Sequence, residues 1–147
     1  EQIRRKSGVL IGLAATPEAV GMQAPRIALV ARSAAFRSLD GERHAAGSHD
    51  IATRMIAMER AHKAILGTGG LNLGVATRIA GTIPSRLARA TEGGEIRVAN
   101  PSGLIAVGAE VSRQGGVWQA GSAVLFRTAR RLMQGEVAVP RGLLARG

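Results

Sequence analysis

The sequence contains no cysteine and no tyrosine, and it has one tryptophan and two phenylalanines among 147 residues. Without cysteine, disulfide scaffolds, zinc ribbons, iron–sulfur sites and a catalytic thiol are excluded within this chain. Because aromatic residues make up 2% of the chain, stacking platforms for single-stranded nucleic acids are nearly excluded too. A length typical of one compact domain and a hydrophobic content of 46% indicate a globular chain with its own core.

Lysine is scarce as well. Only Lys6 and Lys63 occur, so arginine carries most of the formal net charge of +10. A nucleic-acid-binding surface gathers its charge on one face, whereas these arginines are spread along the chain, with small clusters at 4–6 and 130–131. This argues against a nucleic-acid-binding module, which stays as the weaker alternative. The same surplus of positive charge would attract a small polyanionic substrate.

The chain begins with the basic run Arg4-Arg5-Lys6 and the apolar run 8–15, an order that resembles a signal peptide. The apolar run is too short to span a membrane, and no clean cleavage context surrounds it. We therefore expect an amphipathic helix with Ile3, Leu10 and Leu13 on one face. With no membrane or targeting segment, the expected location is cytoplasmic.

Two helices are expected in the middle of the chain. In the first, over about 51–65, four apolar residues and one histidine recur at steps of three and four; they are Ile51, Met55, Met58, His62 and Ile65. Ser48 or Asp50 could cap this helix. After a glycine break at 67–70, a second helix over 71–80 is so apolar that it should be buried almost all round, and Gly70 and Gly74 would let a neighbouring backbone come close.

Strand signals lie on both sides of these helices. One strand is expected at 27–30, before a loop-like segment over 33–48. Others are expected at 95–98, 104–111 and 117–127, with turns at 100–103 and 114–116. Residues 136–139 are expected to end the ordered part of the chain, before a frayed tail over 141–147. The order of strand, helix, helix and then antiparallel strands predicts the α+β class.

The strongest local chemical feature is Gly67-Thr68-Gly69 at a helix start. A helix N-terminus presents unpaired N–H groups and a partial positive charge, and so favours a carboxylate or phosphate. The glycines would let an anion approach the backbone, and Thr68 adds a hydroxyl group. A plain break between two packed helices is an equally good interpretation. The segment lacks the lysine of a nucleotide-binding P-loop.

His62 is the second candidate. On the expected helix it shares the apolar face with Met58 and Ile65, one turn before the glycines. It is then either a hydrogen-bonded core histidine or a residue that faces the bound ligand and exchanges a proton with it. No carboxylate has metal-ligand spacing to a histidine, so no metal site is expected.

Three motifs, in order, resemble the PrpF family. They are the segment from Met58 to Gly69, the turn Asn100-Pro101-Ser102-Gly103, similar to the family's His-Pro-Ser-Gly, and the segment from Phe126 to Gly135, similar to its Ser-Arg-Ser-Ala-Arg-Arg-Leu-Met-x-Gly. The resemblance extends from about residue 8 to Pro140. PrpF-type proteins are 2-methylaconitate isomerases, and their relatives are methylitaconate Δ-isomerases and 4-oxalomesaconate tautomerases. They move a proton and a double bond in small di- and tricarboxylic acids without cofactors.

The resemblance also implies a fold. Family members have the diaminopimelate-epimerase-like fold, in which two similar halves each wrap a sheet around a central apolar helix and the substrate lies between them. Residues 1–147 would be a single C-terminal-type domain of such an isomerase, with an antiparallel sheet around the helix after Gly70. The family's proton-transfer candidates, a lysine and a cysteine, belong to the N-terminal half. Leu66 stands where the epimerases have a catalytic cysteine, so a two-thiol mechanism is not expected.

The resemblance finally implies roles for particular residues. We expect this domain to bind the substrate's carboxylates, with His62 orienting the substrate and no cofactor or metal. The expected binding residues are Met58, Gly67, Thr68, Gly69, Ser102 and Gly103. The implied partners are a small polycarboxylate and the missing N-terminal half or a partner chain, and a homodimer is open. The main alternative is a catalytically inert truncated or orphan domain.

Overall fold

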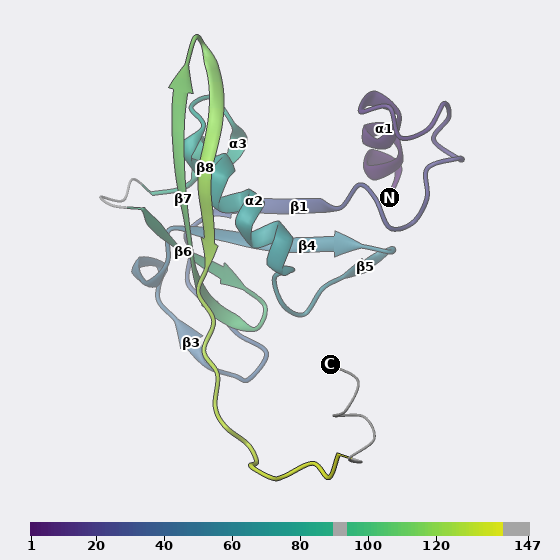
Figure 1. Cartoon of the computed structure of the whole chain (residues 1–147). Helices are drawn as coiled ribbons and strands as arrows, with labels where there is room; N and C mark the ends of the chain where they lie inside the picture. The colour runs from purple at the N-terminus through teal and green to yellow at the C-terminus, as the bar shows by residue number, and fades with distance from the viewer. Residues whose placement is uncertain (90–93, 140–147) are drawn as a thin grey trace.

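The computed structural model describes residues 1–89 and 94–139, and its fold is α+β, as the sequence predicts. The main sheet has the order β1-β4-β6-β7-β8, and outside this order β5 pairs with the last residues of β4 (Figure 1). The β4–β6 pair is parallel, so the expectation of a purely antiparallel sheet is wrong at this pair. The strands are β1 Ile27–Arg32, β4 Ile51–Ala57, β5 Arg60–Ala61, β6 Glu95–Asn100, β7 Gly103–Gln114 and β8 Val117–Leu125.

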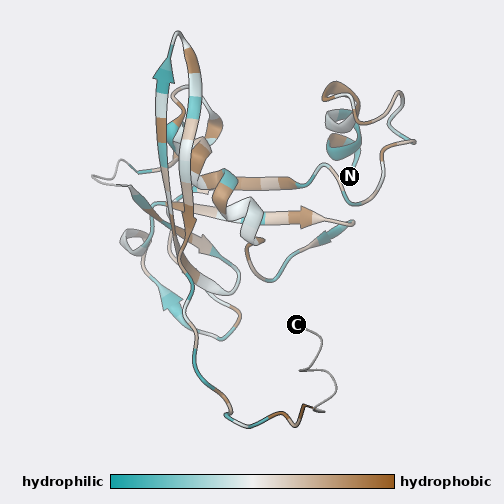
Figure 2. Ribbon diagram, viewed as in Figure 1, coloured by the Kyte–Doolittle hydropathy of each residue, from teal (hydrophilic) through white to brown (hydrophobic). Residues whose placement is uncertain are grey.

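The remaining elements are short. The predicted loop over 33–48 contains the two-residue strands β2 Phe36–Arg37 and β3 Arg43–His44 and one turn of 3-10 helix, Ala46–Ser48. The α-helices of the described chain are α1 Gln2–Leu10, α2 Gly67–Arg78 and α3 Ile83–Leu87. Figure 2 shows the contrast between hydrophobic β1 and hydrophilic β3.

The predicted helix over 51–65 is wrong, because residues 51–57 form strand β4. Burial alternates strictly along this strand, with Ile51, Thr53, Met55 and Ala57 buried. Period-two burial defines a strand, but a polar threonine and a small alanine occupy two of the four inward positions and hide the alternation. Six residue pairs with β1 and a parallel pairing with β6 then decide the conformation.

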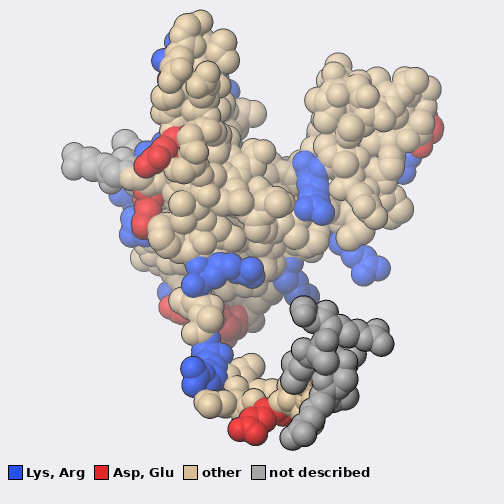
Figure 3. Space-filling view, in the orientation of Figure 1, with Lys and Arg blue, Asp and Glu red and all other residues tan. Residues whose placement is uncertain are grey.

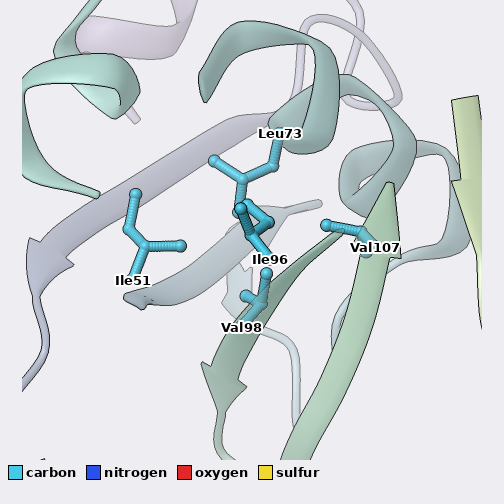
Figure 4. Packing of buried hydrophobic residues seen from close by; sticks show 5 residues of the cluster. All are labelled: Ile51, Leu73, Ile96, Val98 and Val107. Carbon is cyan, nitrogen blue, oxygen red and sulfur yellow. The ribbon is translucent and has the colours of Figure 1, made fainter. Parts of the chain in front are cut away.

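Helix α2 packs against β7 and β8. Its Leu73 contacts buried residues of the strands, Ile51, Ile96, Val98 and Val107 (Figure 4). The expected close approach is confirmed at Gly74, where a Cβ atom would lie 3.3 Å from the carbonyl oxygen of Gly108 on β7. At Gly70 the neighbour is a side chain, since a Cβ atom there would lie 3.1 Å from Leu125.

The helix differs from its prediction in two respects. It begins at Gly67 instead of after Gly70, so the glycines form its first turn. It is also not buried almost all round, because Leu73 and Gly74 are buried whereas Thr68 and Asn72 are exposed. One face therefore packs on the sheet and the other remains open.

Helix α1 buries a face that hydrophobicity does not predict. Ile3 is 73% exposed and Leu10 is 86% exposed, whereas Arg4 is 1% exposed. Gly8 is the other buried residue of the helix. The helix thus contacts the rest of the chain through a glycine and an arginine.

The C-terminal segment after β8 carries no helix or strand over 126–139. The predicted frayed tail at 141–147 lies outside the described residues. The two hairpin turns between β6, β7 and β8 are confirmed, and Gly115 and Gly116 both have positive φ in the second of them.

Asp50 does not cap a helix. Its carboxylate lies at the start of β4 and accepts hydrogen bonds from the Arg97 backbone nitrogen at 2.8 Å and side-chain Nη2 at 3.0 Å. Burial raises the pKa of Asp50, but these hydrogen bonds and the Arg97 charge outweigh it, so the pKa is lowered. The ion pair ties β4 to β6 across their short parallel pairing.

His49, next in sequence, is fully buried. Its ring meets the edge of Phe36 at 5.4 Å between centroids, Nδ1 lies 3.2 Å from Ser48 Oγ, and Nε2 is a buried atom without a hydrogen-bond partner. Burial lowers the pKa of His49, and the opposing charge of Asp50 does not cancel this effect. The neutral imidazole is therefore the form that the fold accommodates.

A lowered folded-state pKa has a defined consequence for stability. At pH values above 6.5, the ordinary pKa of histidine, His49 is neutral in both the folded and the unfolded chain, and it does not reduce the unfolding free energy. The unfolding free energy decreases as the pH falls below that value, by at most about 1.4 kcal/mol per pH unit. Urea unfolding between pH 7 and 5.5 should show this decrease for the wild type and a flatter profile for His49→Leu. Parallel profiles for the two proteins would contradict this assignment.

Candidate functional site

The N-terminus of α2 has no internal partner for its first amides. The N-cap residue Leu66 makes no side-chain capping hydrogen bond, and the first turn contains no acidic residue. The first helical hydrogen bond runs from the Gly70 N–H to the Leu66 carbonyl at 2.8 Å. Since Thr68 is exposed, this end of the helix can accept an anion.

A cavity of about 690 Å³ lies against this end of the helix. Its walls come from β1 and the segment before it, from β4, and from α2 and α3. The wall is mostly apolar, and Arg26 is the one charged residue among the described residues that line it. Its polar lining residues are Gln23, Arg26, Thr68 and Asn72.

A second, smaller cavity of about 260 Å³ shares a wall with the first. Gln23 and Arg26 line both cavities. On the other side of the small cavity are Ala57, Met58 and His62. Arg26 therefore lies at the border of two cavities, one at the helix N-terminus and one lined by a histidine.

His62 reaches this cavity from an irregular segment and not from a helix. It directly follows β5, and its backbone N–H donates to the Met55 carbonyl at 2.8 Å. Its Nε2 atom is buried and has no hydrogen-bond partner. An imidazole nitrogen that lacks a partner beside a cavity is available to a ligand.

The structure brings together part of the predicted site. Met58, His62, Thr68 and Gly69 line one or the other of the two cavities. Gly67 lies at the start of the same helix turn but lines neither cavity. Met58 and His62 line the small cavity, whereas Thr68 and Gly69 line the large one. The helix on which the sequence-based hypothesis placed His62 does not exist.

Ser102 and Gly103 lie elsewhere, at the turn between β6 and β7, and line neither cavity. Ser102 Oγ donates to the Lys63 carbonyl at 2.6 Å. The buried Asn100 side chain accepts from the Ser102 N–H at 3.1 Å and donates to the Gly103 carbonyl at 3.0 Å. This turn therefore fixes the backbone of the segment that leads from His62 to α2, and in this structure its role is structural.

Sequence reasoning missed Gln23, Arg26 and Asn72. The first two precede a strand without any periodic pattern, so nothing in the sequence connects them with the glycines. Arg26 can be assigned to the site only once β1 is known to pair with β4, because this pairing places Arg26 opposite the turn after β4. Asn72 was hidden by the expectation of a helix buried on all sides.

The arginine-rich segment 127–131 is exposed and is separate from both cavities. On the face shown in Figure 3, lysine and arginine side chains lie in several separate patches. In the part of the chain that the structure describes, no group of three or more histidine and acidic side chains could hold a metal ion. No helix there is long and apolar enough to cross a membrane.

Comparisons with known proteins decide the family. The model of the family described as "PrpF protein" matches residues 1–140. The chain belongs to the PrpF family. A 2-methyl-aconitate isomerase of Shewanella oneidensis is 35% identical to this PrpF-family chain over 143 residues, which is 96% of the chain and 36% of that protein. A 3-methylitaconate isomerase of Eubacterium barkeri is 34% identical, over 98% of the chain and 38% of that protein.

A solved structure gives the same result. The crystal structure of a methylitaconate-delta-isomerase matches this PrpF-family chain with a TM-score of 0.77 and 33% identity, over 97% of the chain and 37% of that structure. The α+β fold described above thus matches part of a methylitaconate-delta-isomerase structure. The chain spans little more than a third of the length of these relatives.

One wall of the small cavity contains a strained turn. Met58 and Glu59 form the two-residue connection between β4 and β5, with φ values of 49° and 62°. Such a turn needs positive φ at both positions and favours Asn-Gly. Each non-glycine residue with this left-handed backbone conformation lowers the stability of the folded state by on the order of 1–3 kcal/mol.

Replacing this turn should therefore stabilise the protein. We expect Met58→Asn combined with Glu59→Gly to raise the unfolding free energy by about 1–2 kcal/mol in urea titrations. Glu59→Gln is the matched control, since it removes the weak 3.8 Å ion pair with Arg5 without changing the backbone preference. A double variant no more stable than this control would show that the turn is not strained.

Proposed function

We propose that this chain is the substrate-binding, C-terminal-type domain of a PrpF-type isomerase. The whole enzyme would shift a proton and a double bond, without a cofactor, in small unsaturated di- and tricarboxylic acids similar to 2-methylaconitate. The names of the relatives, 2-methyl-aconitate and 3-methylitaconate isomerase, support this class of substrate. The observation that carries the proposal is that Arg26 lines both cavities and shares the larger one with Thr68 and Gly69 of the uncapped first turn of α2.

These groups fit a polycarboxylate. A guanidinium binds a carboxylate through two parallel hydrogen bonds, and backbone amides at a helix start bind another. The mostly apolar remainder of the large cavity suits the carbon skeleton between the charged groups. The neighbouring cavity, with the unpartnered Nε2 of His62, offers a further polar contact.

The chemistry assigns these groups a role in the reaction. Removal of a proton next to a carboxylate, or at the far end of a conjugated acid, places negative charge on carboxylate oxygens. Hydrogen-bond donors that are fixed before the reaction stabilise that charge. Arg26 and the amides of Gly67, Thr68 and Gly69 would supply such donors, and His62 would orient the substrate.

We further infer that the fold is one half of the diaminopimelate-epimerase-like arrangement, with α2 as its central helix. In this arrangement a second half covers the open face of α2 and carries the proton-transferring lysine and cysteine. The relatives' greater length supports this inference. The second half could belong to a longer polypeptide or to a partner chain, and a homodimer is compatible with either. We propose that the enzyme acts in the cytoplasm.

The main alternative is a catalytically inert truncated or orphan domain. Solvent deuterium uptake into cis-aconitate, followed by NMR, tests this inert alternative. Exchange by the isolated chain would contradict the inert alternative. Binding without exchange would support a domain that depends on its other half. A nucleic-acid-binding role is less favoured, because the charged patches are separate.

Arg26 provides the central test of the proposal. Isothermal titration calorimetry with tricarballylate, a saturated tricarboxylate, should show binding by the wild-type chain and affinity weaker by about 10- to 100-fold for Arg26→Met. The matched control is Arg37→Met, since Arg37 is exposed on β2 and lines neither cavity. Equal affinity for Arg26→Met and the wild type would refute the site, as would equal losses in both variants.

A further inference from the structure

The largest of the fully buried side chains in the described chain is that of an arginine, Arg4 of α1, with 1% exposure. Its Nη1 atom donates to two backbone carbonyls, that of Gly21 at 2.7 Å and that of Ala24 at 2.9 Å. On its other side, Nε donates to the Glu1 carboxylate at 2.9 Å. A buried charge is stable only when paired and hydrogen-bonded, and Arg4 meets this requirement through the backbone of a loop.

That loop leads directly into the candidate site. Gln23 lies between the two carbonyls that Arg4 holds, and Arg26 lies two residues after the second. Both side chains line both cavities. The conformation of this short segment therefore decides where the guanidinium of Arg26 is placed.

A second contact fixes the same loop against α1. Gly8 lies one helical turn from Arg4, and a Cβ atom at Gly8 would be 2.7 Å from Val20 and 3.3 Å from Pro25. Because Gly8 has no side chain, Val20 and Pro25 at the two ends of the loop pack directly on the helix. Arg4 binds the loop backbone between them. Since α1 makes this contact with a polar side chain and a glycine, its apolar residues stay exposed.

We propose that Arg4 is a positioning residue for the ligand-binding site, an inference that rests on the function proposed above. It holds the carbonyls of Gly21 and Ala24 and so fixes the segment that presents Gln23 and Arg26 to the ligand, which Arg4 itself does not touch. The planar guanidinium suits this role, because its donors point in fixed directions toward several acceptors. Without it, Arg26 would sample several positions and bind a carboxylate more weakly.

The first test measures the loop itself, without ligand. Hydrogen exchange followed by mass spectrometry should show faster exchange over residues 20–26 in Arg4→Ala, with unchanged exchange in the β7–β8 hairpin. Lys6→Ala, an exposed position of the same helix, is the matched control and should exchange like the wild type. Unchanged exchange over 20–26 in Arg4→Ala would overturn the proposal even if no ligand binds.

The second test is chemical rescue. Tricarballylate affinity should fall about tenfold or more in Arg4→Ala and should recover in a few millimolar guanidinium chloride, but not in the same concentration of sodium chloride. A general loss of structure would not recover in guanidinium. Normal affinity in Arg4→Ala, or a loss that guanidinium does not restore, would overturn the positioning role. If the wild type itself does not bind, the proposed function fails, and the exchange result still decides the role of Arg4.

A second variant covers the case in which Arg4→Ala does not fold. Gly8→Ala places a methyl group against Val20 and moves the same loop while leaving Arg4 intact. It should weaken tricarballylate binding and speed up exchange over residues 20–26. A folded Gly8→Ala protein with wild-type affinity and exchange would contradict the dependence of the site on this contact.

Discussion

The close contact between α2 and β7 is the constraint on which the rest of the structure depends. Because Gly74 has no side chain, the helix backbone approaches the carbonyl oxygen of Gly108. Leu73 can then reach the buried residues of β4, β6 and β7. A larger residue at position 74 would move the helix outward and open the core, at a cost of about 1–3 kcal/mol.

The same contact sets the position of the helix N-terminus. With its axis fixed on the sheet, α2 presents Thr68 and Gly69 to the cavity that Arg26 also lines. The opposite wall is formed by a loop that α1 holds through a buried arginine. Two contacts therefore position the walls of the candidate site. The glycine contact of α2 with β7 positions the helix N-terminus, and the buried Arg4 positions the loop that leads to Arg26.

Some of this could be predicted from sequence. The β6–β7–β8 meander follows from alternating residues and glycine turns. The proposal of an anion site at Gly67-Thr68-Gly69 follows from the unpaired amides at a helix start. Strand β4 could not be recognised, because Thr53 and Ala57 interrupt its hydrophobic alternation. The buried face of α1 could not be predicted either. Hydrophobicity predicts that Ile3 and Leu10 are buried, whereas the structure buries Arg4, which hydrogen-bonds to backbone carbonyls. Arg26 belongs to the site only through the pairing of β1 with β4, a contact between segments far apart in sequence.

The central claim is that Arg26 and the start of α2 together hold a polycarboxylate, and a crystal structure of the chain soaked with tricarballylate tests it most directly. We predict density for one carboxylate within hydrogen-bond distance of the Arg26 guanidinium. A second carboxylate should lie at the amides of Thr68 and Gly69. Density for the ligand only elsewhere, such as along the exposed arginines of 127–131, would contradict the assignment of this site.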